Sequence, residues 1–247
     1  MDLGLGGRTA LVTGATRGIG LAIARLLAAE GCRVAVSART AADVETVAAD
    51  LGGIAAPGDL TTPDGCESVW VAAGEPSVLV NNLGLRAGSS WADTDVAEMA
   101  AAMAGNLYPA VRLSRLALPA MRRAGWGRIV VISSLFGREA GGAPAYNAAK
   151  AAENSFVTSL ARDTAASGIT VNAVAPGSIL FDGGSWWRRR EADPEGIAAF
   201  VARELPLGRF GTPEEVASAV AFICSDRAAL VTGVCLAVDG GQSRSNI

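Results

Sequence analysis

A glycine-rich turn close to the N-terminus joins a short apolar run to an alanine-rich one, and no other feature constrains the fold as strongly. The run Arg8 to Thr13 has the character of a strand, and Ile19 to Glu30 that of a helix. Between them the chain reads TGATRGIG at positions 13–20. Glycines allow a sharp bend, and a helix N-terminus offers unpaired N–H groups and a positive dipole end. The turn therefore predicts a phosphate cradle, with candidate contacts at Gly14, Thr16, Arg17, Gly18, Ile19 and Gly20.

Short apolar runs continue to alternate with helical stretches along the chain. The other strand candidates are residues 33–37, 77–81, 128–133, 169–174 and 234–238, with a weaker one at 53–56. Their apolar residues do not alternate with polar ones, which is typical of strands buried on both faces of a parallel sheet. The sequence predicts an α/β fold over residues 1–247: a single-domain Rossmann-type doubly wound parallel sheet of about seven strands, with helices on both faces.

One segment, at about residues 177–206, interrupts this alternation. It carries two adjacent glycines, the run Ser-Trp-Trp-Arg-Arg-Arg at 185–190, and a short helix candidate from Pro194 to Arg203. A helix is expected to open after it, with Thr212 as its cap and Pro213 at its first position. An insertion at this point would overhang the carboxyl ends of the strands, where open α/β sheets bind ligands. We therefore expect a substrate lid.

The composition excludes several kinds of site. The chain has no histidine, which removes Ser-His-Asp triads and the commonest metal ligand, and its four cysteines have no zinc-type spacing. We expect free thiols in a reducing compartment and no metal. The net charge of −3 comes without a basic cluster of the kind that binds nucleic acid. No signal peptide and no apolar run of roughly 20 residues is present, so we expect a cytoplasmic protein without a membrane partner.

Further short motifs follow the glycine turn in a fixed order. They are Asp59-Leu60, Asn81-Asn82-Leu83-Gly84, Asn106, Ser134, Tyr146 with Lys150, and Pro176-Gly177. Together with the turn pattern TGxxxGxG, they resemble the short-chain dehydrogenase/reductase family. Residues 205–215 and 238–241 are similar to those of 3-oxoacyl-carrier-protein reductases and their relatives. The resemblance implies hydride transfer between a nicotinamide cofactor and a small-molecule ketone or secondary alcohol.

The end of the second strand indicates which nicotinamide cofactor to expect. Sites for NAD usually carry Asp or Glu there to bind the ribose 2′-hydroxyl, whereas this chain has Ala38 followed by Arg39. Without a carboxylate to repel it, a 2′-phosphate could pair with Arg39 and Arg17. We therefore expect NADP, with NADPH preferred over NADH. The alternative is that Arg39 covers the adenine face or is solvated.

The resemblance also implies further cofactor contacts. Asp59 would bind the adenine amine, and Leu60 would flank the ring. Asn82 would support the central strand where the cofactor approaches it, and Gly84 follows two residues later. Pro176-Gly177 would wrap the nicotinamide.

Two positions depart from the pattern of the family. Leu83 stands where alanine is common beside the cofactor. Phe181 stands five residues after Pro176, where a threonine often binds the nicotinamide carboxamide. Ser178 is the alternative donor for that carboxamide.

Tyr146 and Lys150 lie four residues apart at the expected start of a helix, so their side chains project from one face. Tyrosine has a reference pKa of about 10 and is a poor base at neutral pH, but a nearby ammonium and a positive nicotinamide ring favour the phenolate. We expect Tyr146 to give its proton to the carbonyl oxygen in reduction and to take the alcohol proton in oxidation.

Ser134 is expected to end the fifth strand and to hydrogen-bond the substrate oxygen. Its neighbour Ser133 is the alternative, because successive strand residues face opposite ways. Ser134 is favoured since residues 134–137 match the SxxG placement of the family, although its spacing to Tyr146 is one residue shorter than usual.

Asn106 falls inside an expected helical run from Met99 to Leu118, where an asparagine usually faces solvent. By resemblance, it would instead hold a water that links Lys150 to bulk solvent as a proton relay. Lys150 would also bind the ribose hydroxyls of the nicotinamide.

The lid contains the densest aromatic and basic cluster. Trp186 and Trp187 could wall an apolar pocket while Arg188 or one of the next two arginines receives an anionic group. A solvated arginine run on a surface loop is the alternative and is slightly favoured.

Two further expectations concern partners and activity. The resemblance suggests a homotetramer or a homodimer, formed through the apolar helices at 99–122 and 146–166. A non-catalytic NADP-binding regulator or scaffold of the same fold is the rival function, and the intact set of Ser134, Tyr146, Lys150 and Asn106 argues against it.

Overall fold

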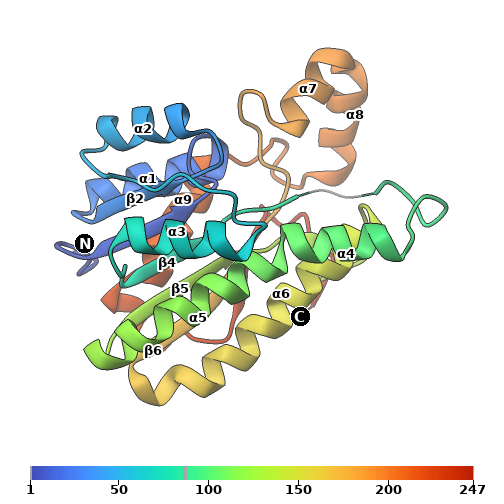
Figure 1. The fold of residues 1–247 in the computed structure, drawn as a ribbon. Helices are drawn as coiled ribbons and strands as arrows, with labels where there is room; N and C mark the ends of the chain where they lie inside the picture. Colours follow the sequence, from blue (N-terminus) through green and yellow to red (C-terminus); the bar gives the residue numbers. More distant parts are fainter. Residues whose placement is uncertain (1, 86–87, 247) are drawn as a thin grey trace.

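A parallel sheet runs through the middle of the molecule. The structure is a computed structural model that describes residues 2–85 and 88–246 (Figure 1). Within these residues the seven strands lie in the order β3-β2-β1-β4-β5-β6-β7, and each pairs parallel with its neighbours. They are β1 (Thr9–Thr13), β2 (Arg33–Ser37), β3 (Ile54–Ala55), β4 (Val78–Asn81), β5 (Gly127–Ile132), β6 (Ile169–Pro176) and β7 (Cys235–Val238). The expected sheet is confirmed.

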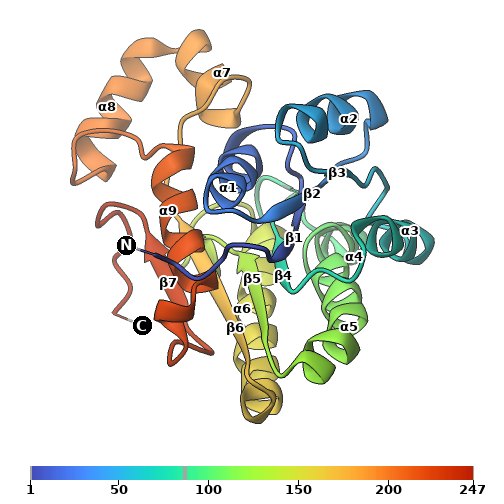
Figure 2. The same cartoon turned by 90° about the vertical axis from the view of Figure 1, so that its left-hand side faces the viewer.

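Helices cover both faces of the sheet (Figure 2). One core cluster joins the sheet to α1 (Gly18–Ala29), α2 (Ala41–Asp50) and α9 (Pro213–Cys224). The other joins it to α3 (Pro63–Ala73), α5 (Leu107–Ala124) and α6 (Pro144–Thr164), and α4 (Val96–Gly105) packs on α6. Helices α7 (Ser185–Ala192) and α8 (Pro194–Glu204) pack on each other and have no buried residues. These two helices stand clear of the sheet at one end of the molecule (Figure 1).

The strand order places the site. After β1 the chain moves outward to β2 and β3, and it then returns to β4 on the opposite side of β1. The carboxyl ends of β1 and β4 therefore border a topological switch point, where open α/β sheets bind ligands. The glycine turn at 13–20 follows β1, and the Asn82 segment follows β4, so both lie at this point.

The structure divides the single helix expected from residue 99 to 118. Helix α4 ends at Gly105 and α5 begins at Leu107, with Asn106 between them at φ −123 and ψ −68. Pro109 has no N–H to donate to the Gly105 carbonyl, so the helical hydrogen-bond ladder cannot continue through this point. Asn106 is therefore a helix junction and not a solvent-facing residue within a helix.

The segment expected to form a lid differs in part from the slightly favoured expectation. The tryptophan-arginine run at 185–190 forms helix α7 and not a surface loop. Helix α8 begins at Pro194 as expected, with the Asp193 side chain accepting from Gly196 N at 2.9 Å. The opening of α9 is confirmed, and Thr212 and Glu215 form a reciprocal capping box there.

None of the helices in the described part of the chain combines the length and apolar character that crossing a bilayer requires. Among the same residues, no group of three or more histidine, cysteine or acidic side chains is arranged to hold a metal ion.

Candidate active site

The glycine turn has the backbone geometry of an anion cradle. Gly14 and Gly18 have φ of +60 and +54, in the left-handed region that favours glycine. A Cβ at Gly20 would collide with the carbonyl oxygen of Gly14, so the turn and the first turn of α1 can approach this closely only with glycine. The N-cap of α1, Arg17, makes no side-chain cap hydrogen bond. The first N–H groups of α1 are thus suited to an anionic ligand.

A hydrogen-bond network ties the turn to the end of β4. Thr13 Oγ1 accepts from the backbone N–H groups of Asn82 and Leu83, at 2.8 and 3.1 Å. The side chain of Asn82 donates to the carbonyls of Thr13 and Gly14, at 2.9 and 3.2 Å. Asn82 therefore links the ends of the two central strands at the switch point.

One cavity, of about 380 Å³, lies between the turn and the end of β2. Its lining brings together the two arginines expected at a 2′-phosphate and the residues expected at an adenine: Gly14, Thr16, Arg17, Ala38, Arg39, Asp43, Asp59, Leu60 and Leu83. The side chains of Arg17 and Arg39 are exposed to solvent. Hydrogen bonds from the Thr61 hydroxyl and backbone N–H hold the pKa of Asp59 below its usual value. Asp59 therefore presents a carboxylate at the cavity.

A second cavity, of about 290 Å³, lies on the other side of the turn. It brings together the expected acid/base pair, both candidate serines and the residues expected at a nicotinamide: Ile19, Asn82, Gly84, Ser133, Ser134, Tyr146, Lys150, Pro176 and Gly177. The two cavities adjoin the same glycine turn, so residues from seven separate segments of the sequence converge around it.

The two serines have different hydrogen-bond partners. Ser133 Oγ donates to the carbonyl of Lys150 at 3.3 Å, which commits it to the start of α6. Ser134 Oγ accepts from Phe136 N at 3.2 Å, and this bond leaves the hydroxyl proton available to donate elsewhere. Both serines line the cavity, but the geometry favours Ser134 as the donor to a substrate oxygen.

Lys150 is buried and has a carboxylate partner that the sequence reasoning missed. Its Nζ donates to the carbonyl of Ile132 at 2.9 Å and to both carboxylate oxygens of Glu153 at 3.0 and 3.1 Å. The two side chains are 2% and 1% exposed. The carboxylate raises the pKa of Lys150 against the opposing effect of burial, while burial raises the pKa of Glu153. The available signal was an acid on the buried stripe of α6, between Ala149 and Val157.

Asn106 lies next to this pair. Its amide donates to Ala102 O at 2.7 Å and to Leu85 O at 2.9 Å, and its Oδ1 accepts from Leu85 N at 3.3 Å. A Cβ at Gly84 would sit 3.5 Å from both Asn106 Oδ1 and Lys150 Nζ. The three residues therefore meet at one point below the cavity.

Comparison with known proteins identifies the fold and its chemistry. Residues 14–243 match a family model described as enoyl-(acyl carrier protein) reductase. The 3-oxoacyl-[acyl-carrier-protein] reductase FabG of Escherichia coli is 40% identical over 243 residues, which are 96% of this chain and 97% of the relative. The chain belongs to the short-chain dehydrogenase/reductase family. It is accordingly an oxidoreductase of that family.

Solved structures of similar proteins agree with this membership. A structure described as a short-chain dehydrogenase/reductase family protein is 38% identical, with a TM-score of 0.86 and 98% of each chain covered. The L-sorbose reductase of Gluconobacter frateurii, solved with NADPH and L-sorbose, is 31% identical. Its TM-score is 0.92, with 99% of this chain and 100% of the other covered.

The two departures from the family pattern have different surroundings. Leu83 lines the 380 Å³ cavity, while the Phe181 ring lies against the glycine turn, 2.7 Å from where a Cβ of Gly18 would be. The alternative donor, Ser178, is held by Gln242: its N–H donates to Gln242 Oε1 at 2.8 Å, and its Oγ accepts from Gln242 Nε2 at 3.0 Å, which leaves its hydroxyl proton available. Gln242 thus fixes the loop after Pro176, a role with no signal in the sequence.

In the segment expected to form a lid, Trp186 lines the site. It lines the 290 Å³ cavity and stacks on Phe200 at 4.5 Å between ring centroids. Trp187 instead contacts the Arg190 guanidinium, 4.4 Å from its ring centroid. Neither Trp187 nor Arg188 is among the described residues that line this cavity, and Arg188 is exposed to solvent. The structure therefore brings one of the three candidate lid residues to the site.

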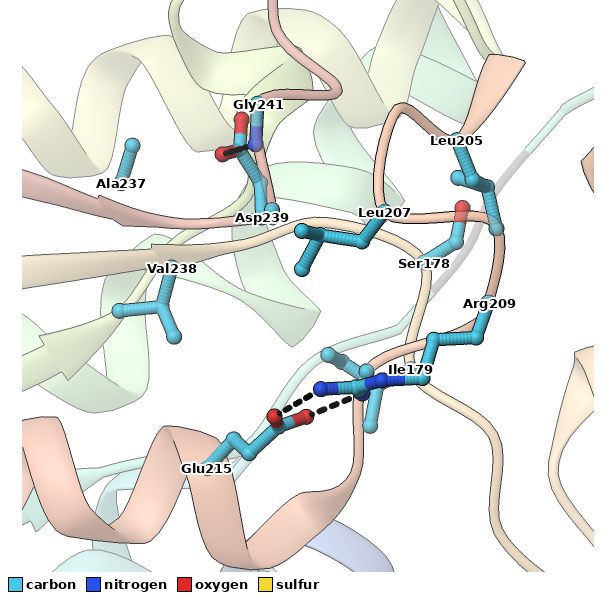
Figure 3. Close-up of a pocket in the computed structure, with 12 residues that line it drawn as sticks. Ser178, Ile179, Leu205, Leu207, Arg209, Glu215, Ala237, Val238, Asp239 and Gly241 are labelled. Atoms are coloured by element: carbon cyan, nitrogen blue, oxygen red, sulfur yellow. Dashed lines mark hydrogen bonds and ion pairs between the residues drawn. The ribbon is translucent and has the colours of Figure 1, made fainter. Parts of the chain in front are cut away.

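A neighbouring cavity of about 370 Å³ shares Ser178 and Ile179 with the site but contains none of the acid/base residues (Figure 3). Its floor is an ion pair in which Arg209 donates to Glu215 at 2.6 and 2.9 Å. These hydrogen bonds lower the pKa of Glu215 to about 2. The pair fixes the chain between the lid and α9, beside the strand end at Asp239.

Proposed function

We propose that this short-chain dehydrogenase/reductase is an NADP-dependent carbonyl reductase that transfers a hydride between the nicotinamide and a ketone or secondary alcohol. The observation that carries the proposal is the convergence of Ser134, Tyr146 and Lys150 on one cavity beside the glycine turn. A 3-oxoacyl thioester is one candidate substrate, because the E. coli relative is named a 3-oxoacyl-[acyl-carrier-protein] reductase. A ketone of specialised metabolism is the other.

The residues present fit such a cofactor. The turn that only glycine can form at Gly20 would receive the pyrophosphate on the N-terminus of α1. Asp59 and Leu60 would bind the adenine, and Pro176-Gly177 would lie along the nicotinamide, which supplies the hydride when it is bound. The NADPH complex of the L-sorbose reductase supports this proposal by analogy.

In the proposed mechanism, three side chains act on the substrate oxygen. Tyr146 donates the proton that the oxygen needs when a carbonyl is reduced and recovers it when an alcohol is oxidised. Ser134 hydrogen-bonds the same oxygen and stabilises the charge that develops on it. Lys150 favours the ionised form of the tyrosine and binds the ribose hydroxyls. Asn106 would connect Lys150 to solvent through a bound water.

The preference for NADPH rests on Arg17 and Arg39. Replacing Arg39 with alanine is expected to raise the KM for NADPH about tenfold or more and to leave the KM for NADH nearly unchanged, because a hydrogen bond to a charged group contributes about 1.5–3 kcal/mol. Steady-state kinetics with both cofactors measure this. Arg33→Ala, at the other end of β2 and also exposed, is the matched control. An equal effect of Arg39→Ala on both cofactors would remove the 2′-phosphate role.

The substrate would lie under a lid formed by about residues 177–206 of a single domain that spans 1–247. Trp186 would form the apolar wall of the pocket. Trp187 and Arg188 are weaker candidates, since an anionic substrate group would have to draw Arg188 in from solvent. A 3-oxoacyl thioester carries such a group if it is attached to a phosphopantetheine arm.

The partners and location follow from the same proposal. We infer a cytoplasmic homotetramer or homodimer that acts on a small molecule. Val96 of α4 and Tyr108 of α5 are 85% and 44% exposed, so this helical surface carries apolar area that a second copy could cover.

Turnover tests the proposal against the rival of a non-catalytic NADP-binding regulator. A panel of 3-oxoacyl thioesters, simple ketones and alcohols is followed at the nicotinamide absorbance with NADPH and with NADH. The proposal predicts NADPH-dependent reduction of at least one carbonyl class. Binding of NADPH without turnover of any compound in the panel would favour the regulator.

A further inference from the structure

Glu153 forms a buried ion pair that the mechanism above does not use. Its carboxylate lies 3.0 and 3.1 Å from Nζ of Lys150, one helical turn further along α6. The pair is almost completely shielded from water, because the two side chains are 2% and 1% exposed. At such depth water screens a charge poorly, so the carboxylate cancels much of the field of the ammonium. Lys150 Nζ also lies 5.7 Å from the ring centroid of Tyr146.

The charged neighbours of this pair can be named element by element. On α6, Glu153 and Tyr146 are the ionisable groups that raise the pKa of Lys150. From β7, Cys235 faces Glu153, and burial raises the pKa of that thiol, which keeps it neutral near pH 7. Arg138, which follows the short helix at 135–137, lowers the pKa of Cys235, whereas Glu153 raises it.

The remaining neighbours within residues 2–85 and 88–246 that the hydrogen bonds and core packing identify are uncharged. From β5 the carbonyl of Ile132 accepts from Lys150, and from the junction of α4 and α5 the neutral amide of Asn106 lies nearby. The β6 residues Val171 and Ala173 pack in the same core cluster as α6 and are apolar. Among the described residues, Glu153 is therefore the anion that hydrogen-bonds directly to the Lys150 ammonium.

We propose that Glu153 is a positioning residue that anchors the Lys150 ammonium by ion pairing and screens its charge from Tyr146, and so sets the pH at which the tyrosine exchanges its proton. The inference rests on the proposed function. Lys150 has three N–H donors. Glu153 and the Ile132 carbonyl accept hydrogen bonds from the ammonium and so fix its direction. Because the screened ammonium stabilises the phenolate less than a bare ammonium would, more of Tyr146 stays as the phenol, which is the form that donates a proton in carbonyl reduction.

The test is a direct titration of Tyr146. The chain has two tyrosines, so a Tyr108→Phe background leaves Tyr146 as the one phenol whose ionisation an ultraviolet difference spectrum reports. Glu153→Gln keeps the shape and hydrogen-bonding capacity but removes the charge. We expect the phenolate midpoint of this variant to move about one pH unit lower, because the ammonium then acts on the phenol without the opposing carboxylate. The acidic limb of kcat/KM for alcohol oxidation should move by the same amount.

Two further variants make the outcome decisive. Asp163→Asn removes one negative charge from the same helix at an exposed position, where Asp163 pairs with Arg122, and it should leave the midpoint unchanged. Glu153→Asp keeps the negative charge, but its side chain is one methylene shorter, so the carboxylate lies farther from Nζ. The phenolate midpoint should again move lower, by less than in Glu153→Gln. If Glu153→Gln does not fold, as judged by circular dichroism, this second variant carries the test.

An unchanged midpoint in the Glu153 variants overturns the proposal, and so does a shift to higher pH. An upward shift would mean that the carboxylate chiefly keeps Lys150 protonated. Because the titration needs neither cofactor nor turnover, its result is independent of whether the proposed carbonyl reductase activity is correct.

Discussion

Replacement of Tyr146 by phenylalanine is expected to lower kcat for carbonyl reduction by about a thousandfold, with little change in the binding of NADPH. The ring and its packing survive the substitution, but the proton donor for the substrate oxygen is lost, and a positioned general acid contributes about 10²–10⁴-fold to a rate. Because the interaction is made in the transition state, the loss should appear equally in kcat and in kcat/KM. Steady-state rates and NADPH fluorescence titration measure the two quantities.

Tyr108→Phe is the matched control for this substitution. Tyr108 is the other tyrosine of the chain, lies on α5 and is 44% exposed. Its variant should retain wild-type kcat. If Tyr146→Phe also kept more than about a tenth of the wild-type kcat, a side chain other than Tyr146 would have to deliver the proton, since the expected contribution of such an acid is far larger.

Replacement of Lys150 by methionine is expected to lower the free energy of unfolding by about 3–5 kcal/mol, because it leaves the Glu153 carboxylate buried without its partner. Equilibrium urea unfolding at a fixed protein concentration measures this loss. Methionine fills a volume similar to that of lysine, so the loss reports the uncompensated charge and not a cavity. Activity should fall as well, because the ammonium beside Tyr146 is removed.

The loss should depend on pH with a definite sign. Burial already raises the pKa of Glu153, and without Lys150 to oppose burial the folded-state pKa rises further above the unfolded value. A group of this kind contributes its full stability below the unfolded pKa and loses it as the pH rises through the folded pKa. Lys150→Met should therefore be least destabilised in acid. The double variant Lys150→Met/Glu153→Leu should recover most of the stability, and a double variant no more stable than the single would contradict the buried charge.

Much of the fold could be predicted because the hydrophobic pattern is regular. Unalternated apolar runs separated by alanine-rich helices indicate a parallel sheet, and all the strand candidates were found in it. Turn and cap chemistry was also readable: the glycines at 14 and 18 do adopt positive φ, and Thr212 does cap α9. These features are local, so the sequence around them is sufficient to predict them.

The features that the sequence did not reveal depend on contacts between distant segments. The orientation of the Asn106 side chain depends on the carbonyl of Leu85, 21 positions back in the chain, which accepts from its amide. The helix break beside it had a local signal in Pro109. Gln242 fixes Ser178 across 64 positions. The burial of Glu153 needs β6 and β7 to close over α6, although its place on the apolar stripe was a usable signal. Helix α7 was missed because three consecutive arginines give no apolar period to detect.

Isotope transfer tests the central claim most directly. NADPH carrying deuterium at the reactive position of the nicotinamide is incubated with the protein and the carbonyl compound that it reduces fastest, and the product is analysed by mass spectrometry and NMR. The account predicts one deuterium on the carbinol carbon of the product in the wild-type protein, and a rate of transfer about a thousandfold lower in Tyr146→Phe. Tight binding of NADPH with no deuterium in any product, or equal transfer by both proteins, would contradict it.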